Sequence, residues 1–213
     1  MNQGLTIRPA GLTDSDLSTR LIYLTMGIEA DWLFGQEKGH PTLKVIADLF
    51  LCKNNRVSHS LVHLAERDGQ VVGLLLAYPG ERLSKLNWLT GWCLLKIVGL
   101  PATIRLARMQ SAYGDLIEAE WDEFYISNLA VFPDFEGQGI GTQLMAYAEE
   151  LARASGLQKC SLIVAFGHEH ACTLYEHLGY KIVRSYLSAH PKVAEGSGGY
   201  HRMVKLLTPP PGS

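Results

Sequence analysis

The chain has 213 residues, 47% of them hydrophobic, which suits one domain with a substantial core. Nineteen lysines and arginines stand against 21 aspartates and glutamates, so the formal net charge is −2. A net charge this close to zero does not attract the protein to a polyanion, so we expect neither nucleic acid nor an anionic membrane as a partner.

The amino terminus lacks the basic segment and apolar run that mark a secretion signal. The longest apolar region, 88–101, contains Lys96 and two glycines and is shorter than the roughly 20 apolar residues of a membrane helix. We therefore expect a cytoplasmic protein that does not span a bilayer. The four cysteines show no Cys-x-x-Cys spacing, which favours reduced thiols over disulfides or metal ligation: Cys52, Cys93, Cys160 and Cys172.

The first half of the chain predicts helices and an antiparallel hairpin. A short strand over 5–8 precedes a helix that Thr13 could cap, and one or two helices follow within 31–57. Two strands, 60–67 and 70–78, are joined by Asp68-Gly69, a dipeptide typical of two-residue hairpin turns. Because a strand–loop–helix–strand unit follows later, we expect a mixed sheet.

The segment 79–121 is too long for an ordinary loop and predicts two helices with a break at 99–101. Trp88 and Trp92 make it unusually apolar for a surface excursion. Either it packs on its own domain or on a second subunit, as in a homodimer, or it is a lid over an acceptor pocket. We expect a single domain over 1–208 and a frayed proline-rich tail over 209–213.

The stretch 123–156 predicts a strand, a glycine loop and a helix. Glycines at 137, 139 and 141 precede apolar residues at helical spacing. The first turn of a helix offers unpaired N–H groups, and glycines let a phosphate approach them. A P-loop is excluded because Thr142 and Gln143 follow with no lysine, and no acidic residue stands where a dinucleotide fingerprint requires one. We predict a pyrophosphate site, the alternative being a tight turn before an amphipathic helix.

Two blocks carry a resemblance to a known family. Residues 131–141, Val-Phe-Pro-Asp-Phe-Glu-Gly-Gln-Gly-Ile-Gly, resemble the acetyl-CoA pyrophosphate motif of the GNAT superfamily of N-acetyltransferases. Residues 168–180 resemble the family's Asn-x-x-Ala-x-x-Leu-Tyr-x-x-x-Gly-Phe, and an apolar strand over 160–165 joins the blocks. The resemblance, close over 124–184, implies an α/β (α+β) fold: a mostly antiparallel central sheet flanked by helices, with a helical insertion between the third and fourth strands.

The resemblance implies acetyl transfer from acetyl-CoA directly to a primary amine of a small molecule or peptide, without a covalent intermediate or metal. By resemblance, the coenzyme would be bound mostly by main chain, and these positions are Leu129, Ala130, Val131, Gly137, Gln138, Gly139, Ile140, Gly141 and Thr142. His168 stands where asparagine is usual and could supply a comparable donor. Glu136 replaces the usual arginine or glutamine, and its charge should weaken the pyrophosphate site.

Tyr175 is the candidate general acid, because a phenol can donate a proton to the leaving thiolate. The alternative is a core role, since it shares a helical stripe with Leu174 and Leu178. Glu123 is the candidate base, the alternatives being a solvated rim charge and deprotonation of the amine through water. His168, His170 and His177 have a spacing that does not indicate a metal site.

Two other functions stay open. A pocket lined by the apolar insertion would suit a longer acyl-CoA donor. Glu136 instead is compatible with a module that binds the coenzyme without turning it over.

Overall fold

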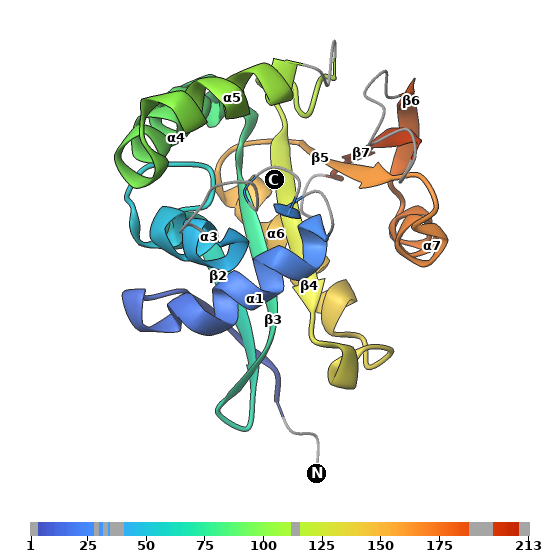
Figure 1. The fold of residues 1–213 in the computed structure, drawn as a ribbon. Coiled ribbons are helices and arrows are strands. Elements are labelled where there is room, and N and C mark those ends of the chain that lie inside the picture. The colour runs from blue at the N-terminus through green and yellow to red at the C-terminus, as the bar shows by residue number, and fades with distance from the viewer. Residues whose placement is uncertain are drawn as a thin grey trace. The chain divides into compact units, whose positions relative to one another are not determined.

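The computed structural model describes residues 4–27, 30–31, 34, 41–111, 116–187 and 198–208 (Figure 1). The chain divides into two compact units. Unit 1 comprises Met1–Leu76, Leu83–Gln110 and Asn128–Leu144, and unit 2 comprises Ala77–Arg82, Ser111–Ser127 and Met145–Ser213. The predicted single domain over 1–208 stays a prediction, and the tail 209–213 lies outside the described residues.

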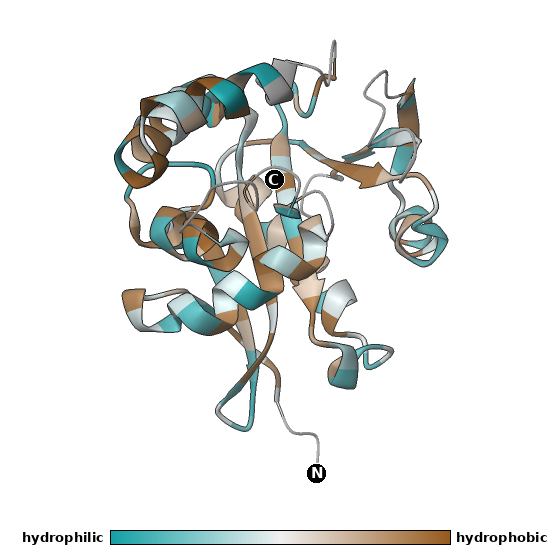
Figure 2. Ribbon diagram, in the orientation of Figure 1, coloured by the Kyte–Doolittle hydropathy of each residue, from teal (hydrophilic) through white to brown (hydrophobic). Residues whose placement is uncertain are grey.

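Within the described part of the chain, seven strands form one sheet in the order β1-β2-β3-β4-β5-β7-β6. The pairs β1–β2, β2–β3, β5–β7 and β6–β7 are antiparallel, and β4 runs parallel to β5. The predicted mixed sheet is therefore confirmed. Figure 2 shows β3 largely apolar, as expected of a buried strand. The strands are β1 (Thr6–Pro9), β2 (Val62–Arg67), β3 (Gln70–Pro79), β4 (Phe124–Val131), β5 (Lys159–Ala165), β6 (Lys181–Leu187) and β7 (Gly199–Leu206).

Helices flank the sheet, as predicted. In unit 1, α1 and α3 pack against each other over β2 and β3 (Figure 1) and bury apolar residues such as Leu21 and Val45. Short 3-10 turns at Leu12–Asp14, His59–Leu61, Gly80–Arg82 and Pro133–Phe135 connect the elements. The described helices are α1 (Ser15–Met26), α3 (Thr42–Leu51), α4 (Leu83–Val98), α5 (Leu100–Ser111), α6 (Ile140–Ala154) and α7 (Glu169–His177).

The hairpin turn is confirmed at Asp68-Gly69. Arg67 pairs with Gln70, and the two residues between them have φ of 54° and 75°. Positive φ at both central positions is the geometry that follows the right-handed twist of the strands.

The predicted cap of the first helix is wrong. The helix begins at Ser15 after a 3-10 turn, and its N-cap is Asp14 rather than Thr13. The Asp14 carboxylate accepts from the Gly11 amide at 2.7 Å and from the Arg8 guanidinium at 2.8 Å. Arg8 thereby lowers the pKa of Asp14 and fixes the corner between β1 and α1. The Asp14 side chain therefore contacts Arg8 and the Gly11 amide and makes no hydrogen bond to the first turn of α1.

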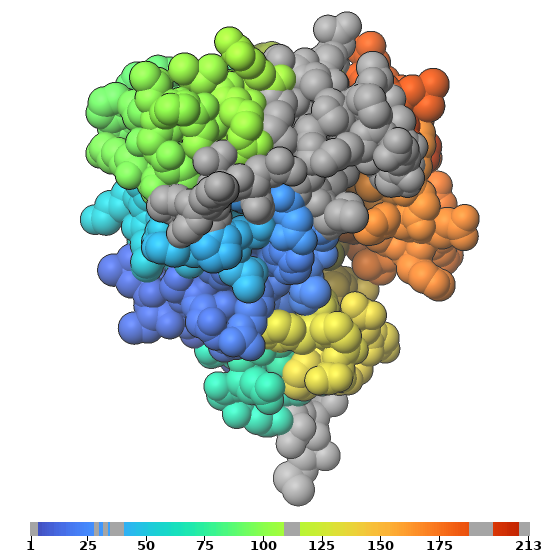
Figure 3. All heavy atoms as spheres, viewed as in Figure 1, coloured from blue at the N-terminus to red at the C-terminus, as the bar shows by residue number. Residues whose placement is uncertain are grey.

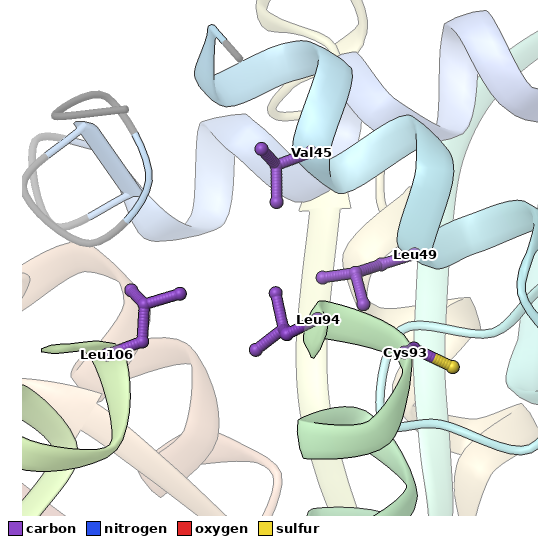
Figure 4. Packing of buried hydrophobic residues seen from close by; sticks show 5 residues of the cluster. All are labelled: Val45, Leu49, Cys93, Leu94 and Leu106. Atoms are coloured by element: carbon purple, nitrogen blue, oxygen red, sulfur yellow. The ribbon is translucent and has the colours of Figure 1, made fainter. Parts of the chain in front are cut away.

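The helical insertion after β3 is confirmed. Helices α4 and α5 are separated at Gly99, which has φ of 81°. Leu94 and Leu106 form a buried cluster with Val45 and Leu49 of α3 (Figure 4). One face of the insertion therefore packs on its own unit, in agreement with the first of the two alternatives. Its tryptophans do not take part, since Trp88 is 70% and Trp92 50% exposed.

The expectation of four reduced cysteines is wrong for two of them. Cys52, at the end of α3, forms a disulfide with Cys93 of α4, whereas Cys160 and Cys172 are free. The two bonded cysteines lie 41 residues apart. This pair has no recognisable sequence spacing, because the two cysteines are brought together by the packing of α4 on α3.

One described stretch, Gly80–Arg108, is long and apolar enough to cross a membrane by length and composition alone. Only 17% of the apolar window is buried, and a single stretch of this kind is weak evidence for a membrane span. The stretch is also two helices broken at Gly99 rather than one continuous span.

Candidate functional site

The glycine loop lies in unit 1 between β4 and α6. β4 ends at Val131, and the Phe132 amide then donates to the Val72 carbonyl at 3.0 Å, which ties the start of the loop to β3. Pro133–Phe135 forms a 3-10 turn, and α6 begins at Ile140. The predicted order of strand, glycine loop and helix is confirmed.

Two loop glycines adopt a conformation that other residues rarely take. Gly137 and Gly139 have φ of 71° and 77°. A Cβ added at either position would meet no atom within 4 Å, so open space lies in front of this backbone. A substitution here would strain the backbone and place a side chain where a ligand would approach.

The start of α6 presents its own unpaired donors. Its first bond to the preceding loop runs from the Gln143 amide to the Gly139 carbonyl at 3.1 Å. The amides of Ile140, Gly141 and Thr142 therefore precede the helix's own hydrogen-bond ladder and lie at the positive end of its dipole. This end of the helix favours a phosphate.

A buried contact fixes the start of α6 against the sheet. Ile140 and Leu144 are 1% and 0% exposed. On β3, a Cβ built on Gly73 would lie 2.9 Å from the Ala130 carbonyl oxygen, 3.2 Å from Leu144 and 3.3 Å from Ile140. Glycine at position 73 thus permits the close approach of three elements beneath the loop, a role that the sequence reasoning missed.

A cation from the β2–β3 hairpin reaches the loop. Arg67, the last residue of β2, donates to the side-chain oxygen of Gln138, and Gln138 donates to the Asp134 carbonyl at 3.3 Å. Glu136 is exposed nearby in sequence. Arg67 was also missed, because it lies 71 residues from Gln138 and no local pattern connects them.

β4 leaves its parallel ladder early. Phe124, Tyr125 and Ile126 pair with Cys160, Ser161 and Leu162, and the ladder ends there. The later residues of β4, Leu129 to Val131, are therefore not engaged in that ladder. The main-chain N–H and C=O groups of Leu129 to Val131 are the ones predicted to contact the pantetheine arm.

Tyr175 lies in unit 2 on α7. Its carbonyl accepts from the Tyr180 amide at 2.9 Å, and Gly179, with φ of 90°, ends the helix. Its ring centroid lies 6.2 Å from that of Tyr180. Desolvation raises the pKa of Tyr175 to about 12, so the phenol keeps its proton at neutral pH.

Glu123, also in unit 2, is 3% exposed, so the alternative of a solvated rim charge is wrong. Its carboxylate accepts from the Arg202 guanidinium and from the Glu120 amide at 2.9 Å. The neighbouring Asp122 forms its own ion pair with Lys159 at 2.6 Å. Buried carboxylates are paired in this way because an isolated charge is costly to desolvate.

His168 is exposed at the N-cap of α7, and its carbonyl accepts from the Cys172 amide at 3.0 Å. His170 and His177 are exposed on the same helix. Across the described ranges, no group of three His, Cys, Asp or Glu side chains is placed to hold a metal ion.

Comparisons with known proteins identified a matching family and a curated relative. The model of the acetyltransferase (GNAT) family matches residues 27–180. The aminoalkylphosphonate N-acetyltransferase of Salmonella typhimurium is 29% identical over 118 residues, 55% of this chain and 54% of that protein. The chain thus spans about half the length of this curated relative.

Solved structures share the fold. A crystal structure described as an acetyltransferase has a TM-score of 0.68 at 23% identity, covering 95% of this chain and 100% of that one. An N-acetyltransferase from Staphylococcus aureus Mu50 also gives 0.68 at 23% identity, over 93% and 99%. The NatC complex bound to Gag peptide and CoA gives 0.55 at 14% identity, over 96% and 99%.

Proposed function

The chain belongs to the GNAT family of acetyltransferases, and within it we propose that this protein transfers an acetyl group from acetyl-CoA directly to a primary amine. The glycine loop carries this proposal. Its left-handed glycines, the open space before them and the unpaired amides of α6 together suit a diphosphate.

The coenzyme would be held in two parts by main chain. The amides from Gly137 to Thr142 would bind the pyrophosphate, and the edge of β4 from Leu129 to Val131 would pair with the pantetheine arm. The second assignment is supported by the early end of the β4–β5 ladder. His168 is proposed as a further coenzyme contact, and its exposure leaves it accessible.

Tyr175 is proposed as the general acid. When the amine attacks the thioester carbonyl, a carbon–nitrogen bond forms, the carbon–sulfur bond breaks and the thiolate leaves as its conjugate acid. A phenol with a pKa near 12 remains protonated until this step and can donate when the thiolate develops. The ring also packs near Tyr180, so a purely structural role is the alternative that must be tested.

Glu123 is proposed as the general base, with deprotonation through water as the alternative. The amine must lose a proton, and if Glu123 accepts it, the carboxylate loses the charge that pairs with Arg202. Deprotonation through water does not require this loss. A Glu123→Gln variant separates the two routes: loss of the acidic limb of the pH–rate profile would identify Glu123 as the base, and an unchanged profile would assign the proton to water.

The acceptor is proposed as a small-molecule or peptide amine. An aminoalkylphosphonate is a second specific candidate because of the relative that bears this name, although the similarity covers about half of each chain. A panel of aminoalkylphosphonates, polyamines, amino sugars and peptides, analysed by mass spectrometry for a gain of one acetyl group, tests this choice.

Thiol release from acetyl-CoA with such a panel tests the function itself. We expect release with at least one amine and much less with Tyr175→Phe. Thiol release from longer acyl-CoA but not from acetyl-CoA would show that the donor is a longer acyl-CoA. Coenzyme binding without release across the panel would favour the non-catalytic module.

A further inference from the structure

Helix α4 carries an exposed stripe of tryptophan and lysine. The stripe consists of Lys85, Trp88, Trp92 and Lys96, spaced by three, four and four residues, so the four side chains share one helical face. Trp88 is 70% and Trp92 50% exposed, and both lysines are exposed. The Lys96 ammonium lies 5.4 Å from the Trp92 ring centroid.

The opposite face of α4 is fixed. Leu86, Cys93 and Leu94 are 2%, 4% and 8% exposed, and the last two pack on α3. The Cys52–Cys93 disulfide adds a covalent link at the same place. The stripe therefore cannot turn inward without breaking this packing. α4 and α5 form part of the visible molecular surface, green in Figure 3.

The charge of this segment differs from that of the whole chain. Residues 83–111 contain four lysines and arginines and no aspartate or glutamate. This local excess of basic residues is not apparent from the net charge of the whole chain, which is −2. α5 adds apolar surface, since Leu100 is 58% and Ile104 44% exposed.

We propose that the α4 stripe docks the protein on an anionic lipid bilayer surface. Tryptophan partitions to the level of the headgroups because its ring is apolar and its N–H is polar, and lysine reaches the lipid phosphates along its aliphatic stem. Basic residues beside such aromatic groups are the chemistry of a helix lying in the membrane interface.

The stripe lies on the bilayer and does not cross it. α4 has 16 residues, which span roughly 24 Å, and Gly99 ends it. Insertion would also expose the face that packs on α3. A second copy of the chain fits less well: antiparallel pairing of two stripes about a two-fold axis would bring lysine against lysine, and neither α4 nor α5 offers an acidic partner.

Sedimentation with vesicles tests the proposal. We expect the full chain to bind phosphatidylcholine vesicles containing about 30% phosphatidylglycerol and to bind pure phosphatidylcholine much more weakly, with loss at high salt. The emission of Trp88 and Trp92 should shift to shorter wavelength on binding, because the rings leave water.

Variants make the test specific. The double change Lys85→Gln and Lys96→Gln should weaken partitioning about 30-fold, from about 1 kcal/mol per lysine. Trp88→Ala with Trp92→Ala should weaken it at least about tenfold. Trp121→Ala is the matched control, because Trp121 is 75% exposed but lies outside α4 and α5, and it should bind as the native chain does. The lysine variant alters only exposed side chains and so tests the proposal even if the tryptophan variant folds poorly.

Equal binding to both vesicle types, or an equal loss in Trp121→Ala, would overturn the proposal. So would a native dimer, seen by light scattering, that binds no vesicles and becomes monomeric when Trp88 and Trp92 are replaced.

Discussion

At the scale of single residues, the two proposed catalytic side chains have different surroundings. Tyr175 is partly buried and desolvation raises its pKa to about 12, whereas Glu123 is buried in an ion pair with Arg202. The raised pKa keeps the Tyr175 phenol protonated at neutral pH but makes it a weaker acid, so donation requires direct contact with the developing thiolate. A proton acceptor is hindered by the second environment, since taking up a proton would neutralise the carboxylate that pairs with Arg202.

Replacing Tyr175 by phenylalanine should lower kcat by about 100-fold to 10,000-fold and leave the KM for acetyl-CoA unchanged, because the ring stays and the proton is lost. Steady-state kinetics measures this. Tyr180→Phe is the control: it removes a buried hydroxyl from the ring beside Tyr175 and should retain activity.

The raised pKa also predicts a pH profile. Because burial disfavours the phenolate, the rate should show no descending limb from Tyr175 below about pH 10. A descending limb near neutral pH that disappears in Tyr175→Phe would contradict the assignment.

Glu136 and Arg67 should act on the coenzyme in opposite directions. Glu136→Gln removes an exposed negative charge near the proposed diphosphate and should tighten acetyl-CoA binding roughly threefold at physiological salt. Arg67→Gln removes the cation that contacts Gln138 and should weaken binding by roughly three- to tenfold. Calorimetry at low and high salt measures both, and the charge argument fails if neither change depends on salt.

At the scale of secondary structure elements, close approach beneath the loop depends on one missing side chain. Gly73 on β3 lies where a Cβ would be 2.9 Å from the Ala130 carbonyl oxygen. Neither backbone can yield easily, because the Phe132 amide ties the end of β4 to Val72 beside it.

Gly73→Ala should therefore lower the free energy of unfolding by about 1–3 kcal/mol and weaken acetyl-CoA binding, since β4 must shift where it is proposed to hold the coenzyme. Urea denaturation and calorimetry measure the two effects. Gly91→Ala on α4 is the matched control: its Cβ would meet no atom within 4 Å, and helix propensity favours alanine by up to about 1 kcal/mol. Equal destabilisation by both changes would refute the close-approach argument.

The disulfide joins α3 to α4 and should contribute to stability. Reduction should lower the free energy of unfolding by about 2–4 kcal/mol, because the unfolded chain regains the freedom of a long closed loop. Thiol titration in denaturant should find two free thiols before reduction and four after it. Four thiols without reductant would contradict the bond.

At the scale of the whole molecule, coenzyme binding should stabilise the native chain. CoA at about 100 times its dissociation constant adds about 2.7 kcal/mol if it binds only the folded state. For a chain of this length, the melting temperature should rise by roughly 5–10 °C. Thermal denaturation with CoA and with adenosine as a control lacking the diphosphate measures this, and equal shifts would argue against the loop as a pyrophosphate site.

The disulfide also bears on the predicted cytoplasmic location, because such bonds persist mainly in oxidising compartments. The location stays a prediction, as do the acceptor and the absence of a nucleic-acid partner. The absence of a membrane partner was predicted from total charge, and the α4 stripe now gives a local reason to test it.

The sequence by itself determined the features that local chemistry dictates. Asp68-Gly69 specified the hairpin turn, and the glycines at 137 and 139 specified the loop before α6. The length of the insertion and the break at 99–101 specified its two helices. These features follow from backbone sterics and periodicity within a few residues, and the two family motifs added the fold and the class of reaction.

Only the tertiary structure decided which distant residues meet. Arg67 at Gln138, Gly73 at Ala130, Arg202 at Glu123 and Cys52 at Cys93 are contacts between separate elements. Their geometry depends on how strands register and how helices pack, which no local pattern encodes. The same reason explains why the contact between Arg8 and Asp14 was missed: it joins β1 to the residue before α1, whereas the cap prediction considered only the adjacent residues.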